Sequence, residues 1–143
     1  MARREIQLHQ IDTTDTLYVL DANYKQHKIR LAGIDAPERK QAYGLASRKH
    51  LASIVAGKQV TVEYQKRDRY GRIVGKVLHD GIDACLEQVK AGFAWHYKKY
   101  QHEQSTQDQR LYAVAEANAR DARLGLWREN NPNPPWEFRR LYR

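Results

Sequence analysis

The sequence predicts a domain of mixed α+β class, and three features of its pattern support this prediction. The first third of the chain consists of short runs that partly alternate apolar and polar residues and are rich in β-branched and aromatic side chains, a pattern typical of strands. A helical spacing of apolar residues begins at residue 43, and two more strand-like runs follow it. Five strands with a helix between the third and the fourth indicate a small closed β-barrel of OB type, and two further helices complete the fold.

The expected elements are separated by turn-forming residues. The five strands are expected at residues 4–11, 15–21, 27–33, 59–64 and 72–79. The three helices are expected at residues 43–55, 83–91 and 106–124, each followed by a glycine that suits a helix C-terminus. Apolar stripes predict the buried faces of the first and third helices, namely Leu45, Ala46, Leu51, Ala52, Ile54 and Val55, and Leu111, Val114, Ala115, Ala119 and Ala122.

The chain length of 143 residues predicts one domain over residues 1–143. Residues 128–143 form a C-terminal tail whose three closely spaced prolines argue against a regular helix. We expect Trp136 and Phe138 to pack this tail onto the rest of the domain.

The charge balance is strongly basic, with 25 Lys and Arg against 17 Asp and Glu and a formal net charge of +8. Such an excess favours polyanionic partners such as nucleic acid, although a soluble surface would also account for it. The single cysteine, Cys85, excludes an internal disulfide and a cysteine-based zinc site. No apolar run reaches the roughly 20 residues of a membrane span, and the first residues do not read as a signal peptide.

Acidic residues form the first candidate site. Asp15 opens the second expected strand and Asp35 closes the third, so antiparallel pairing would place both carboxylates at one end of the sheet. Like charges so placed repel unless a cation or a proton is present, and oxygen ligands favour Ca²⁺ or Mg²⁺. Glu38 follows Asp35 by three positions, with Pro37 between them. The alternative is that these are ordinary loop acids that bond local amides.

Arginines and tyrosines form the second candidate site. Arg30 lies five positions before Asp35, and Arg72 follows the turn sequence DRYG. A guanidinium can bind two phosphate oxygens at once, although either arginine could equally be a surface residue. Tyr70, Tyr97 and Tyr100 could stack on bases or fill the seam between barrel and helix. The six histidines show no metal-ligand spacing, so we expect surface or half-buried positions for them.

The chain closely resembles the staphylococcal (micrococcal) nuclease, or thermonuclease, family from about residue 6 to residue 138. The resemblance rests on DT at positions 15–16, RLAGIDAPE at 30–38, DRYGR at 68–72, AGFAWHYKKY at 91–100 and the ending GLW…PPWEFR, all in the family's order. It implies an OB-type barrel with three helices and a Ca²⁺-dependent phosphodiesterase. The implied enzyme hydrolyses DNA and RNA, as single strands or breathing duplexes, and leaves 3′-phosphate ends.

The resemblance also implies a role for each matching residue. Asp15, Asp35 and the backbone carbonyl of Ala36 would bind Ca²⁺. Glu38 would act beside the attacking water, and Arg30 and Arg72 would bind the phosphate. Four further residues would contact the substrate: Arg69, Tyr70, Tyr97 and Tyr100. A monomer and a secreted or periplasmic location are expected on the same ground.

Two departures from the family pattern bear on these expectations. Thr13 and Thr14 stand where the family usually has Asp and Gly, which puts the Ca²⁺ affinity in question. Cys85 stands where many members have a buried asparagine, which bears on stability. The alternative function is a catalytically silent module that binds nucleic acid or protein, although such modules typically lack some of the acids or arginines that this chain keeps.

Overall fold

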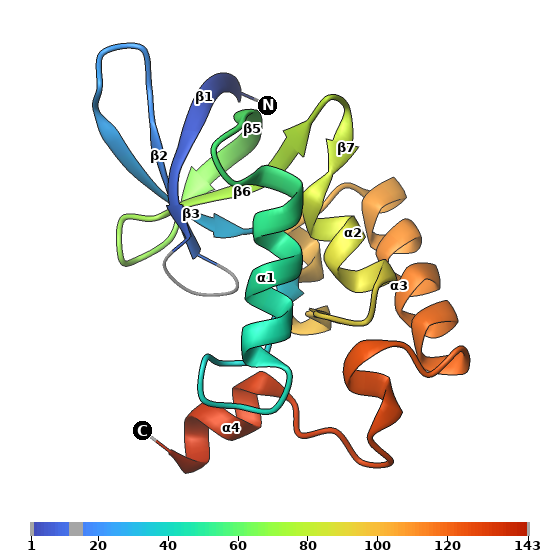
Figure 1. Cartoon of the computed structure of the whole chain (residues 1–143). Helices are drawn as coiled ribbons and strands as arrows, with labels where there is room; N and C mark the ends of the chain where they lie inside the picture. The colour runs from blue at the N-terminus through green and yellow to red at the C-terminus, as the bar shows by residue number, and fades with distance from the viewer. Residues whose placement is uncertain (1, 12–15, 143) are drawn as a thin grey trace.

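The computed structural model describes residues 2–11 and 16–142, and within them a curved sheet of six strands packs beside four α-helices (Figure 1). The strand order is β3-β2-β1-β5-β6-β7. These strands are β1 (Ala2–Ile11), β2 (Thr16–Leu20), β3 (Gln26–Leu31), β5 (Gln59–Arg67), β6 (Ile73–His79) and β7 (Ile82–Asp83). A separate pair consists of β4 (Ile34–Asp35) and β8 (Trp95–His96).

Two kinds of pairing shape the sheet. Neighbouring strands are antiparallel, and β2 pairs with β3 in a register that sets Thr16 opposite Arg30. In addition, β3 runs parallel to β6 along residues 29–31 and 73–75, which brings strands from the two sides of the sheet together. The α+β class is therefore confirmed. The sheet differs from the expected five strands because the short strand β7 extends it.

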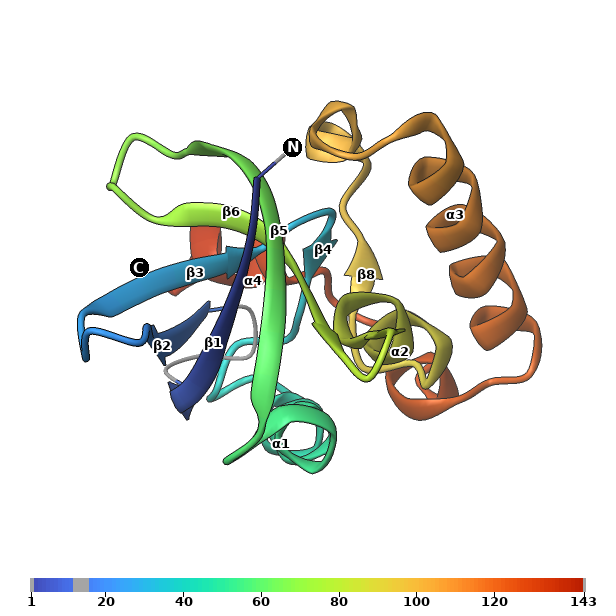
Figure 2. The ribbon, with the colours of Figure 1, turned by 90° about the horizontal axis from the view of Figure 1, so that it is seen from above.

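The helices cover one side and one end of the sheet (Figure 2). They are α1 (Gly44–Val55), α2 (Ala84–Lys90), α3 (Thr106–Asp121) and α4 (Pro135–Leu141), with the 3₁₀ turns η1 (Lys98–Glu103) and η2 (Gly125–Arg128). Within the described residues, none of these helices is long and apolar enough to cross a membrane.

The main core lies between the sheet, α1, α2 and α3. The alternating strand pattern places every second side chain inside, as predicted for strands with one buried face. Fully buried members include Leu17, Val19, Ile29, Leu31, Leu51, Val62 and Val77. A smaller aromatic cluster joins Trp95, Trp127 and Trp136 beside Ala119 and Leu126, so the expected packing role of Trp136 is confirmed.

The expected buried faces of two helices were partly wrong. Leu51 and Val55 of α1 are buried as expected, but Leu45 is 58% exposed and Ser47 is buried. In α3 the apolar residues Leu111 and Val114 are about half exposed.

Two hydrogen-bonded polar side chains of α3 explain why Leu111 and Val114 face away from the core. The Tyr112 hydroxyl donates a hydrogen bond to Asp83 at 2.5 Å, and the Glu116 carboxylate accepts one from the His96 backbone N–H at 2.7 Å. Both anchors are buried, and they set the face of α3 that includes Ala115 and Ala119. Bonds to distant partners therefore outweigh apolar periodicity in this helix.

Two further expectations need correction. The tail contains a regular helix, α4, because Pro134 is its N-cap and Pro135 occupies the first turn, where a proline loses no intrahelical bond. His27 and His96 are 6% and 2% exposed, rather than at the surface or half-buried.

Candidate active site

Most of the side chains that the sequence analysis singled out line one cleft of about 1370 Å³. The cleft is bordered by β3, β4, the turn between β5 and β6, η1 and α4. The predicted residues in its lining are Arg30, Asp35, Glu38, Arg69, Tyr70, Arg72, Tyr97 and Tyr100. Ala36 is buried at 1% exposure, and Asp15, Thr13 and Thr14 lie outside the described residues.

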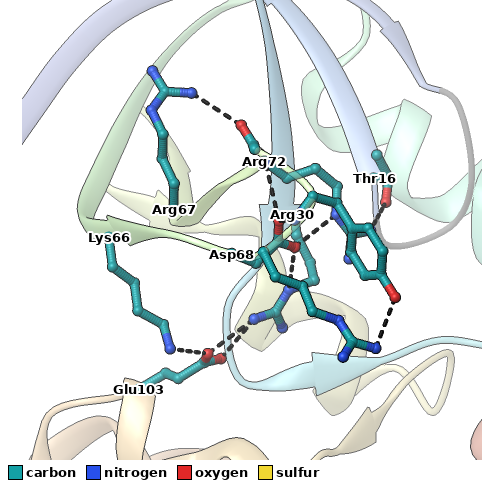
Figure 3. A network of polar contacts seen from close by, with 10 residues as sticks. Thr16, Arg30, Lys66, Arg67, Asp68, Arg72 and Glu103 are labelled. Carbon is teal, nitrogen blue, oxygen red and sulfur yellow. Dashed lines mark hydrogen bonds and ion pairs between the residues drawn. The ribbon is translucent and has the colours of Figure 1, made fainter.

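Arg30 points from β3 toward a buried acid on η1 (Figure 3). One guanidinium nitrogen of Arg30 donates to both carboxylate oxygens of Glu103, at 3.0 and 2.9 Å. The Glu103 side chain is 3% exposed and also receives the ammonium of Lys66 at 2.8 Å. A buried carboxylate thus holds two cations at the wall of the cleft.

Arg72 is fixed by the tight turn that joins β5 to β6 (Figure 3). Asp68 accepts the backbone N–H groups of Tyr70 and Arg72 at 2.9 and 3.0 Å, and its other oxygen accepts from Arg72 Nε at 2.8 Å. Burial tends to raise the pKa of Asp68, but the hydrogen bonds from Arg72 and Tyr70 outweigh it and the net pKa is lowered. The carboxylate therefore stays ionised and orients Arg72.

The same turn contains the other two predicted substrate residues of this region. Gly71 has a φ of 80°, which confirms the unusual backbone angle expected there. Tyr70 is 69% exposed, and the guanidiniums of Arg69 and Arg72 lie 4.9 and 5.7 Å from its ring centre. Arg72 also reaches the Thr16 hydroxyl at 3.3 Å.

Asp35 and Glu38 are joined by an arginine for which no role was predicted. Arg139 on α4 donates to the two oxygens of Asp35 at 3.0 and 2.6 Å and to Glu38 at 2.7 Å. The Asp35 side chain is 2% exposed, whereas that of Glu38 is 30% exposed. The hydrogen bond with Asp35 raises the pKa of the Arg139 guanidinium, although burial opposes it.

The expected strand position of Asp35 was wrong. Strand β3 ends at Leu31, and Asp35 lies on the separate strand β4, where it pairs with Trp95 of β8. Arg30 and Asp35 are consequently on different strands, although both line the cleft. The sequence could not separate them because one apolar run continues from β3 into β4.

Aromatic rings form another wall of the cleft. The Tyr97 ring stacks on Trp136 of α4 at 5.1 Å and 4°, and it meets the edge of Tyr100 at 5.0 Å. The Arg30 guanidinium lies 5.6 Å from the Tyr100 ring centre. Burial and the nearby Asp35 raise the pKa of Tyr97, so its hydroxyl stays protonated.

Comparison with known proteins shows the family of this chain. A family described as "Staphylococcal nuclease homologue" matches residues 28–129, which is more than half of the chain. A protein of Escherichia coli named "Uncharacterized endonuclease" is 44% identical over 126 residues, covering 87% of this chain and 78% of that protein. The chain belongs to the staphylococcal nuclease family.

Other relatives of the staphylococcal nuclease family agree with this assignment. A Haemophilus influenzae protein, also named an uncharacterized endonuclease, is 41% identical over 91% of this chain and 70% of its own length. A protein of Arabidopsis thaliana named a staphylococcal-like nuclease is 41% identical over 81% of this chain and 34% of its own length. The plant protein is therefore much longer than the matched region.

The residues present fit the cation that the staphylococcal nuclease family implies. Asp35 is a buried carboxylate, and both it and Glu38 already bind a positive group, the Arg139 guanidinium. Oxygen donors of this kind suit a hard ion such as Ca²⁺. Within the described residues, however, no group of three or more acidic, histidine or cysteine side chains converges on one point. Asp15, the remaining predicted carboxylate, lies outside these residues.

Several residues of the cleft were missed by sequence reasoning. Asp68 is the first residue of the quoted motif DRYGR, so this turn motif was a sequence signal that could have identified it. Arg139 is the last residue of the quoted ending PPWEFR, so a motif was available there too. Glu103 offered no signal, since it lies 73 positions from its partner Arg30. Trp136 was expected only to pack, yet its ring covers Tyr97 in the cleft.

Proposed function

We propose that this chain is a Ca²⁺-dependent phosphodiesterase that hydrolyses DNA and RNA regardless of the sugar and leaves 3′-phosphate ends. The observation that carries the proposal is the convergence of Asp35, Glu38, Arg30 and Arg72 on one cleft. Relatives named endonuclease or staphylococcal-like nuclease add support. An OB-like form of the curved sheet, as the family implies, belongs to the same proposal.

The proposed site would act on a phosphodiester through its own side chains. Asp15, Asp35 and the carbonyl of Ala36 would hold the ion. A bound Ca²⁺ would supply positive charge to a phosphate oxygen and lower the pKa of a water. Glu38, which is partly exposed, would orient that water and accept its proton. As the water oxygen bonded to phosphorus, the bond to the 5′ oxygen would break, and that oxygen would take up a proton from solvent to leave as a hydroxyl.

The two arginines would bind the phosphate oxygens. A guanidinium presents a planar fork that matches two of these oxygens and stabilises the charge that develops in the transition state. In the absence of substrate, Asp68 binds the Arg72 guanidinium and Glu103 binds the Arg30 guanidinium. Preorganised donors of this kind lose little free energy to reorientation when substrate enters.

Recognition of the polymer would come from charge and stacking. Basic side chains line the cleft, among them Lys28, Lys66, Arg67, Arg69, Lys98, Lys99 and Arg120. Tyr70, Tyr97 and Tyr100 offer ring faces and edges near the arginines, and base stacking of this kind is tolerant of sequence. Such a surface suits single strands or breathing duplexes of either sugar.

Cleavage of labelled single-stranded DNA and RNA across a Ca²⁺ titration tests the proposal. We expect cutting that requires Ca²⁺, stops on addition of a chelator and leaves 3′-phosphate ends. Folded protein that does not cut at saturating Ca²⁺ would overturn it.

A non-cleaving module that binds nucleic acid or protein is the second candidate function. It is favoured because three side chains of the proposed site already have partners inside the protein. Arg30 pairs with Glu103, Arg72 with Asp68, and Asp35 with Arg139. Retention of oligonucleotide without cleavage would support this candidate.

Location and oligomeric state complete the proposal. We expect a secreted or periplasmic monomer, on the family resemblance alone. Cell fractionation and light scattering of the purified protein test the two points separately.

A further inference from the structure

Helix α4 places a positive charge on the acidic pair of the cleft. Arg139 bonds both oxygens of Asp35 and one of Glu38, at distances from 2.6 to 3.0 Å. Asp35 is almost completely buried, so a cation beside it greatly lowers the cost of its charge. Arg139 thus fills the electrostatic role that an ion would fill at this position.

The same helix covers the neighbouring aromatic wall. Trp136 lies one helical turn before Arg139 and stacks face to face on Tyr97. A nucleotide base that stacked on this face of Tyr97 would need the space that Trp136 occupies. One short helix therefore fills two positions of the cleft, the cation position and a stacking position.

Arg139 and a divalent ion would compete for Asp35. A bidentate guanidinium uses both oxygens of Asp35, and its charge would repel an ion within a few ångströms. Ion binding then requires Arg139 to withdraw or to turn toward a phosphate. The ion's apparent affinity equals its intrinsic affinity multiplied by the fraction of molecules in which Arg139 has withdrawn.

Helix α4 is attached in a way that allows withdrawal. It has seven residues and follows a largely exposed stretch at positions 128–134. Its last residue, Leu141, and Tyr142 just after it are 65% and 71% exposed. Short elements with exposed flanks open at lower free energy than a core does. Withdrawal of α4 must break the packing of the buried Pro135 and of Trp136 on Trp95 and Tyr97, together with the Arg139 bonds.

We propose that α4 is an autoinhibitory segment, in which Arg139 and Trp136 occupy the cation and nucleotide positions until a divalent ion and nucleic acid displace them. This inference rests on the proposed function, because it takes Asp35 as an ion ligand. It adds that ion and substrate assist one another, since each favours the same withdrawn state of α4.

The test compares two arginines of the same helix by calorimetric Ca²⁺ titration without substrate. Arg139→Gln should lower the dissociation constant for Ca²⁺ by about tenfold or more, because the competing cation is gone. Arg140→Gln removes the same charge from a side chain that is 69% exposed and paired with Glu137. It should change the constant by no more than about twofold, the size of a screened surface effect. Arg139→Lys, which keeps the charge without the fork, should fall between them.

Hydrogen exchange at residues 135–141 supplies a second readout. Addition of Ca²⁺ to the wild-type protein should speed exchange in α4, whereas Arg139→Gln should exchange quickly from the start. Circular dichroism establishes that each variant is folded.

The outcomes separate the two proposals. Ca²⁺-dependent cleavage by the wild type with unchanged or weaker Ca²⁺ binding in Arg139→Gln would overturn autoinhibition and leave the proposed nuclease intact. Absence of Ca²⁺ binding in both proteins would overturn both proposals. Ca²⁺ binding to Arg139→Gln that is tighter than in the wild type would support autoinhibition even if neither protein cleaves.

Discussion

One guanidinium nitrogen of Arg30 donates hydrogen bonds to both carboxylate oxygens of Glu103, at 3.0 and 2.9 Å, across 73 positions of sequence. The pair links β3 to η1 and aims a proposed phosphate-binding side chain into the cleft. Because the Glu103 side chain is 3% exposed, breaking the pair would leave a buried charged group without a partner, which costs free energy.

Glu103→Gln should therefore affect both stability and catalysis. The substitution removes the charge that holds Arg30 and Lys66, and we expect the free energy of unfolding to fall by about 1–3 kcal/mol. The cleavage rate should fall because Arg30 loses its orientation. Urea unfolding and steady-state kinetics measure the two effects. Lys66→Met is the control for stability. The Lys66 side chain is half exposed, so its ion pair with Glu103 should contribute less than about 1 kcal/mol. Equal losses of stability in both variants would contradict the anchoring role of Glu103.

Glu38→Gln tests the proposed acceptor of the water proton. The amide keeps the shape of the side chain but cannot accept the proton, so the rate should fall by about 10²–10⁴. The Glu38 side chain is 30% exposed and Asp35 retains Arg139, so the far-ultraviolet circular dichroism should not change. Single-turnover cleavage measures the rate. Glu87→Gln, on α2 outside the cleft, serves as control, and a wild-type rate in Glu38→Gln would remove this residue from the mechanism.

Gly44→Ala tests how the loop before α1 positions Glu38. An added Cβ would lie 2.0 Å from the Glu38 carbonyl oxygen and 2.9 Å from that of Arg39. The loop must shift, and we expect a loss of about 1–3 kcal/mol in stability together with a lower cleavage rate. Thermal unfolding and kinetics report the two losses.

Gly57→Ala is the matched control at the other end of α1. Its added Cβ would meet no atom within 4 Å, and only its φ of 70° opposes the change. That strain costs about 1–2 kcal/mol and lies far from Glu38, so activity should persist. Equal activity losses in the two alanine variants would show that strain in α1, rather than the Glu38 loop, controls the rate.

The stability of the protein should depend on the protonation of His96. Burial lowers the pKa of His96 below its ordinary value of 6.5. The unfolded chain therefore takes up this proton at a higher pH than the folded protein does. The stabilising contribution is complete above about pH 6.5 and is lost as the pH falls toward the folded pKa, by up to about 1.4 kcal/mol per pH unit.

Urea unfolding at a series of pH values from 8 downward, compared with His96→Gln, isolates this contribution. The difference in stability between the two proteins should shrink as the pH falls below 6.5. A difference that stays constant with pH would show that His96 does not change its pKa on folding.

The sequence determined four of the strands and several residues of the cleft. Alternation at period two identifies β2, β3, β5 and β6, because it reports which side chains of a strand face the core. The motifs RLAGIDAPE and DRYGR predicted Arg30, Asp35, Glu38 and Arg72, which line one cleft. Their chemical roles stay predictions.

Only the tertiary structure decided which partners those residues have. Periodicity reports a buried face but not what covers it, so the true faces of α1 and α3 depended on contacts from other elements. Arg139 reaches Asp35 across 104 positions because α4 packs back over the cleft. Trp136 and Phe138 predicted that the tail packs back onto the domain, but no local signal shows that Arg139 reaches Asp35. The free energy that favours this contact comes from a buried carboxylate and an aromatic stack far away in sequence.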